Sequence, residues 1–203
     1  MHTHLFAVTE TLAAFLRARL ESDPQLGLLF NPGLGGSMIV SPSNPQELAF
    51  LRQEGVSVWL YRVVRDENRL NDPHLRPGPF ETRNPPLPVR LQYLITPFVR
   101  NSTANSSETE QLVMGKIMQS LHDHSGFAGA DLAGDLRGTA HNFHVRIETL
   151  SLEELTRVWD SLDRPYQLSV SYEAAVVLIE SETSERTAPV VVAEPVTGII
   201  VGP

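Results

Sequence analysis

Residues 142–179, NFHVRIETLSLEELTRVWDSLDRPYQLSVSYEAAVVLI, decide the fold, because they predict a strand, a helix and a second strand in one continuous piece. In the first strand, Phe143, Val145 and Ile147 alternate with polar residues, which is the period of two of a half-buried strand. Ser151 and Glu154 then form the S-x-x-E pattern of a capping box, which opens a helix. The helix carries an apolar stripe at helical spacing, made of Leu152, Leu155, Trp159 and Leu162.

Pro165 ends this helix, and the second strand is expected from Tyr166 to Ile179. Its first half alternates, whereas residues 174–179 are all apolar, which predicts that the second half is covered on both faces. About 17 residues separate the two strands, enough for a right-handed crossover between parallel strands. A hairpin that encloses the helix also satisfies the pattern, so the sequence leaves the direction of pairing open.

The composition predicts a soluble domain with a real core. A length of 203 residues favours one domain with at most an appendage, and 41% apolar with 20% charged residues is ordinary for such a domain. A net charge of −8 argues against a sequence-independent grip on nucleic acid or on an anionic membrane. The absence of cysteine excludes disulfides and cysteine-ligated metals. No signal peptide pattern and no apolar window of ~18 residues occur, so we expect a protein made in the cytoplasm without a membrane span.

Four further segments show clear periodicity. Apolar residues at helical spacing predict a first helix over residues 5–20, which ends near Asp23 and Pro24. Residues 56–64 are rich in β-branched and aromatic side chains and predict a central strand. Residues 89–95 predict another strand, ended by Pro97. A second helix is predicted with a capping box at Ser107 and Glu110 and with a stripe of Leu112, Met114, Ile117, Met118 and Leu121.

The remaining segments are predicted with less regular structure. A short strand is expected at residues 37–40 and a helical turn at 47–52. Residues 65–88 hold six prolines and predict a long loop, and loops of this length are usually functional or mobile. Residues 125–141 carry four glycines, which favours a flexible connection.

We predict a domain over residues 1–181 and a C-terminal extension over residues 182–203. The extension follows a polar break, and its β-prone residues are candidates for an interaction site: Val190, Val191, Val192, Ile199, Ile200 and Val201. A free hydrophobic strand is an aggregation hazard, so a chain that carries one usually pairs or covers it. The extension therefore predicts strand addition to a neighbouring subunit, with folding back onto its own sheet edge as the alternative. Pro195 cannot donate to a ladder and should divide the extension.

Four histidines are the candidates for a metal site, namely His122, His124, His141 and His144. Zinc needs three or four convergent ligands with an ordered second shell, whereas His122 and His124 fall at a helix end and His144 faces outward on a strand. We therefore expect surface or capping histidines, with no metal ligand and no cofactor. No nucleophile elbow, phosphate-binding loop or dinucleotide fingerprint occurs, and the sequence predicts no enzyme.

Several motifs, in order along residues 5–180, resemble a known family. They are Val8-Thr9-x-x-Leu12, Val58-x-Leu60-Tyr61-Arg62-Val63, Asn68-x-Leu70-Asn71, Pro85-Pro86-Leu87, Leu91-x-Tyr93-Leu94-Ile95-Thr96, Glu110-x-Leu112, Met118-x-x-Leu121-His122-Asp123, Leu150-Ser151-Leu152-Glu153-Glu154-Leu155-x-Arg157-x-Trp159 and Pro165-Tyr166-x-Leu168-Ser169-Val170-x-Tyr172. The chain resembles the N-terminal domain of the cap, or tail-terminator, protein of antifeeding-prophage-like extracellular contractile injection systems.

The resemblance implies a fold and a role that the residues alone do not give. It implies an α/β (α+β) single domain with a mixed sheet flanked by helices, similar to phage tail terminators. It further implies a homo-hexameric ring that ends the inner tube and the sheath at the distal end, with tube and sheath proteins as partners. The last sheath layer then becomes a second candidate partner for the C-terminal extension. The rivals are a metal-dependent enzyme at the four histidines and a monomeric adaptor domain that binds an extended peptide.

Overall fold

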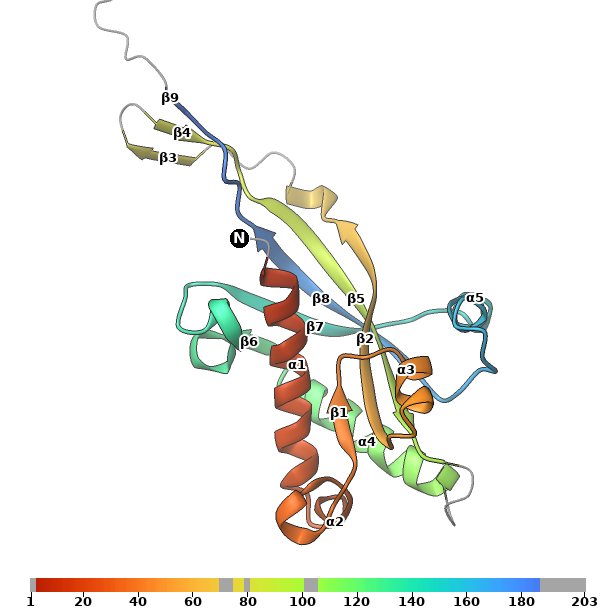
Figure 1. Cartoon of the computed structure of the whole chain (residues 1–203). Coiled ribbons are helices and arrows are strands. Elements are labelled where there is room, and N and C mark those ends of the chain that lie inside the picture. Colours follow the sequence, from red (N-terminus) through yellow and green to blue (C-terminus); the bar gives the residue numbers. More distant parts are fainter. Residues whose placement is uncertain (1–2, 70–74, 79–80, 101–105, 187–203) are drawn as a thin grey trace, which may run out of the picture.

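The computed structural model of the chain describes residues 3–69, 75–78, 81–100 and 106–186 (Figure 1). Its α-helices are α1 (His4–Glu21), α2 (Gly27–Phe30), α3 (Pro45–Phe50), α4 (Ser106–Asp123) and α5 (Leu152–Asp160). Its strands are β1 (Ile39–Ser41), β2 (Gly55–Arg65), β3 (Leu75–Gly78), β4 (Glu81–Arg83), β5 (Leu87–Phe98), β6 (Gly126–Ala128), β7 (Asn142–Glu148), β8 (Val170–Ile179) and β9 (Ser184–Arg186). The predicted α/β class with a mixed sheet flanked by helices is confirmed.

The main sheet has six strands in the order β1-β2-β5-β8-β7-β6. β1 runs parallel to β2, and the other neighbours are antiparallel. The strand β2 lies inside this sheet, as predicted for residues 56–64.

β7 and β8 are the two strands predicted within residues 142–179. They pair antiparallel, with His144 opposite Ala175 and Glu148 opposite Ser171. The right-handed crossover is therefore wrong, and the hairpin that encloses a helix is correct. The physical reason is the position of α5, which lies beyond the ends of both strands, so the chain returns beside the strand it left (Figure 1).

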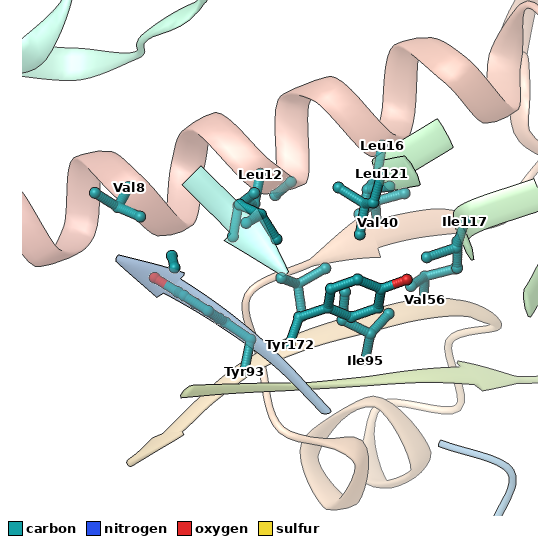
Figure 2. Close-up of a cluster of buried hydrophobic side chains, with 14 of the residues drawn as sticks. Val8, Leu12, Leu16, Val40, Val56, Tyr93, Ile95, Ile117, Leu121 and Tyr172 are labelled. Atoms are coloured by element: carbon teal, nitrogen blue, oxygen red, sulfur yellow. The ribbon is translucent and has the colours of Figure 1, made fainter. Parts of the chain in front are cut away.

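One face of the sheet packs against α1 and α4 and forms the larger core (Figure 2). Val8, Leu12 and Leu16 of α1 point to the sheet, where Tyr93 and Ile95 of β5 are fully buried. The apolar spacing of residues 5–20 therefore predicted the buried face of α1 correctly.

The other face carries a smaller core built by α5. Trp159 is 1% exposed and packs with Leu94 and Leu162. The capping box is confirmed, since Ser151 Oγ accepts a hydrogen bond from Glu154 N–H while the Glu154 carboxylate accepts one from Ser151 N–H. Leu152, by contrast, is 68% exposed, so the predicted stripe is wrong at its first position.

α4 differs from the sequence-based prediction in its start and in its buried face. The helix begins at Ser106, so Ser107 lies inside its first turn, and Glu110 Oε1 accepts a hydrogen bond from Val99 N–H instead of closing a capping box. Leu112 and Met118, which were predicted in the buried stripe, are exposed, whereas Val113 is buried. The stripe is narrower than the spacing suggested, because one side of α4 is left uncovered.

β5 ends and β8 begins at residues other than those the sequence predicts. β5 continues through Pro97 to Phe98, because β8 pairs with β5 only as far as Ile95 and the proline lies where β5 has a neighbour on one side. β8 begins at Val170, so Tyr166 and Leu168 precede it and are exposed. Within residues 174–179, Ala174 and Val177 are buried but the others are half-buried, so coverage on both faces is wrong there.

The proline-rich residues 65–88 are more regular than the predicted loop. They contain β3 and β4, which form a three-stranded sheet with β9 in the order β3-β4-β9. This second sheet, here called the arm, projects from one end of the main sheet (Figure 1). The pairing of Arg83 with Ser184 also shows that the segment after residue 181 begins in contact with the arm. The domain boundary at residue 181 stays a prediction.

Candidate functional site

A polar network lies on the α5 side of the main sheet, around the carboxylate of Glu148. Gln92 Nε2 donates to Glu148 Oε1 at 2.6 Å, Ser171 Oγ donates to Glu148 Oε2 at 2.7 Å, and Tyr61 OH donates to the same oxygen at 3.2 Å. These residues come from β5, β8, β2 and β7, so the network joins four neighbouring strands. Burial raises the pKa of the Tyr61 hydroxyl, which keeps this donor protonated.

Glu173 extends this network with a second carboxylate that is only 4% exposed. Arg146 donates to Glu173 Oε1 through Nε at 3.0 Å and through a terminal nitrogen at 2.7 Å. Arg90 lies 3.6 Å from Glu173 Oε2 and also 3.9 Å from Asp66 Oδ1. Charged side chains are almost never fully buried unless they are paired, and here the arginines supply the partners.

The network surrounds a hollow of about 400 Å³ whose rim holds Arg62, Arg146 and Ile147. The alternation in the first half of the second predicted strand places Glu173 opposite its apolar face. No spacing signal pairs it with Arg146, because that pairing depends on the register of β7 against β8.

An apolar groove lies on the opposite face of the sheet, between α4 and β7. It encloses about 670 Å³ and is lined chiefly by Met118, Leu121, Ile147 and Tyr172. Ile147 is 51% exposed and Met118 is 39% exposed. Both were predicted to face the core, but neither belongs to it, and both are left exposed beside the groove.

The edge of the sheet next to this groove has no strand partner in the described part of the chain. β6 pairs only with Asn142–His144 of β7, and the last contact on that side is Val145 N–H donating to Ser125 O at 2.7 Å. Backbone groups alternate sides along a strand, so the N–H and C=O of Ile147 also point to this open side. The groove and the open edge together form a continuous surface, here called the α4/β7 site.

A second exposed apolar surface lies at the end of α3. Phe50 is 84% exposed and Leu51 is 61% exposed, and both line a hollow of about 470 Å³. The α4/β7 site and the surface at Phe50 are exposed apolar patches, and such patches often mark protein contacts.

Comparison with known proteins identifies the family of this chain. Residues 7–193 match the family model described as the Pvc16 N-terminal domain. The chain belongs to this family. The resemblance seen in the sequence is thereby confirmed.

Two solved structures share the fold of this Pvc16 N-terminal domain. One is the sheath/tube terminator of PVC, an extracellular contractile injection system, in the extended state; it is 19% identical with a TM-score of 0.61 and aligns with 97% of this chain. The other is the tube-terminating cap of the anti-feeding prophage, 20% identical with a TM-score of 0.59, aligned with 94% of this chain. The chain spans 64% and 60% of the length of these two proteins. No curated protein sequence is significantly similar to it.

The four histidines of the metal hypothesis make separate contacts in this Pvc16 N-terminal domain. His122 lines the α4/β7 site, and His124 stacks on Phe15 and lies 3.6 Å from Asp131. His141 packs edge-on against His4, and His144 lies beside Gly126. Among the described residues, no group of three or more histidine, aspartate or glutamate side chains is placed to hold a metal ion.

Two further sequence-based expectations concern the C-terminal extension and membrane-spanning segments. The candidate interaction residues Val190, Val191, Val192, Ile199, Ile200 and Val201 lie outside the described residues, so their role stays a prediction. None of the helices in the described ranges combines the length and the apolar character needed to cross a membrane.

Proposed function

We propose that this chain is the terminator module of a contractile injection system, which ends the inner tube and the sheath at the distal end of the particle. The observation that carries this proposal is the family match over residues 7–193. The likeness to two terminator structures supports it, since both align with more than nine tenths of the chain. The role is structural and not catalytic: partners bind to surfaces, and no substrate is turned over.

The proposed assembly is a homo-hexameric ring that contacts the tube protein and the sheath protein, without nucleic acid and without insertion into a membrane. A closed ring uses heterologous contacts, in which two different surfaces of one subunit meet those of its neighbours. The chain offers such surfaces at opposite ends, with the arm at one end and α4 at the other (Figure 1). We propose that assembly takes place in the cytoplasm and that the ring then forms part of an extracellular particle.

The mass of the purified chain in solution tests the ring. Light scattering should give about 135 kDa, six times the 22.5 kDa of one chain. A monomeric adaptor domain would give 22.5 kDa. Because the tube could act as a template, the copy number should also be counted on assembled particles. A single copy per particle end would contradict the ring.

A further inference from the structure

The α4/β7 site is built to accept an added strand. Its open edge offers the N–H and C=O of Ile147, and the groove beside it is lined by Met118, Leu121 and Tyr172. Strand addition gains affinity from main-chain hydrogen bonds, while alternate side chains of the added strand enter a groove. An occupant of this site must therefore be extended, apolar on the groove side and free of bulky charge.

We propose that the α4/β7 site binds residues 190–192 of a second copy of this chain, added as a strand beside Ile147. The sequence around these residues is TAPVVVAEPV, in which three consecutive valines have a single charged residue nearby. β-branched residues suit a strand, and valine side chains suit a groove formed by Met118, Leu121 and Ile147. The nearby charge is Glu194, which lies outside the run of three valines.

Residues 190–192 cannot reach the α4/β7 site of their own copy, because the chain between them and the site is too short. Arg186 ends β9 in the arm, and Val190 and Val192 follow four and six residues later, at most ~14–22 Å away when fully extended. Tyr172 at the site lies seven residues before the end of β8, which alone corresponds to ~23 Å. The arm continues outward beyond that end (Figure 1). Residues 190–192 thus cannot reach their own groove, so the donor must be a second copy.

This inference goes beyond the proposed cap role, because it names the contact by which two copies meet. It accounts for the exposure of Met118 and Ile147, which a second copy would cover. It also accounts for the short β6, which stops before the part of β7 that the added strand would occupy.

Disulfide cross-linking between single-cysteine variants tests the contact, since the chain has no cysteine of its own. Met118→Cys is mixed with a tagged Val191→Cys or Val192→Cys variant, oxidised mildly and run on a non-reducing gel. Successive side chains of a strand face opposite sides, so one of the two tail positions should give a mixed dimer and the other should give much less. Phe50→Cys, an exposed position at the end of α3 that lines a separate hollow, is the matched control and should give no mixed dimer.

A second pair of variants distinguishes the specific contact from nonspecific association. Ile147→Glu places a charge at the site and should abolish the mixed dimer, whereas Ile147→Val should retain it. Because Ile147 is half-exposed, neither change should lower the melting temperature appreciably. The proposal is overturned if Met118→Cys and Phe50→Cys cross-link equally or not at all, or if a chain carrying both Met118→Cys and a tail cysteine cross-links within itself. A hexamer that forms without the cross-link overturns this contact and leaves the cap proposal standing.

Discussion

Trp159 Nε1 donates a hydrogen bond to Ser169 Oγ at 3.1 Å, inside the small core that joins α5 to the segment before β8. This bond ties the enclosed helix to the strand that follows it. It also satisfies the polar atom of a side chain that is 1% exposed. The bond therefore holds α5 against the segment that leads into β8.

Trp159→Ala should destabilise the chain by ~3–5 kcal/mol, because it removes a buried aromatic ring and leaves a cavity. Leu152→Ala on the same helix is the control and should stay within ~0.5 kcal/mol, since Leu152 is exposed. Urea unfolding measures both. Equal effects would show that α5 packs by the stripe predicted from the sequence and not as described.

Glu173→Gln should lower the free energy of unfolding by ~1–3 kcal/mol, because it removes a buried charge that accepts from Arg146 and faces Arg90. Glu153→Gln removes an exposed i,i+4 pair with Arg157 and should cost no more than ~0.5 kcal/mol. Chemical unfolding of the two variants compares them directly. Equal losses would contradict the burial of the network around Glu173.

Stability should fall when the pH rises above ~10. Burial raises the pKa of Tyr93, and of Tyr61 and Tyr172, above the ordinary value of 10.0. The unfolded chain loses these protons first, so the stabilisation is complete below the ordinary pKa and is lost as the pH climbs through the folded-state pKa. Melting temperatures across this range should decline, and Tyr93→Phe should make the decline shallower. An unchanged slope in Tyr93→Phe would contradict the burial of that hydroxyl.

Truncation after Glu185 should weaken the contact between copies while leaving the melting temperature unchanged. The reason is that residues 190–192 are proposed to add to a second copy and not to their own sheet. Size-exclusion chromatography and thermal melts of the full and truncated chains measure the two effects. A large drop in melting temperature would mean that the extension belongs to its own core.

Local signals in the sequence predicted local structure well. The Ser151 capping box and the buried position of Trp159 depend on neighbours within one helix, and both are confirmed. The direction of β8 was open, because about 17 connecting residues suit both a crossover and a hairpin. Only the antiparallel register, with Arg146 opposite Glu173, decides it.

The α4/β7 site was harder to predict, because it consists of apolar side chains and backbone groups that the rest of the described chain does not cover. Met118 and Ile147 have the spacing of core residues, and nothing in the sequence shows that α4 leaves a groove above β7. The sequence does not predict the arm either, because the arm depends on a long-range contact. Its strand β4 pairs with β9, about a hundred residues away in the chain. The proposed role as a terminator rests on the family resemblance and not on composition or spacing.

The most direct test of the central claim is the length of assembled particles, measured by electron microscopy with and without this chain. Tube and sheath subunits should still polymerise in its absence, because the proposed role is to end growth and not to start it. We expect a broad length distribution or unstable particles without the chain, and uniform lengths when it is restored. Particles of normal, uniform length in its absence would contradict the proposal that it caps the tube and sheath.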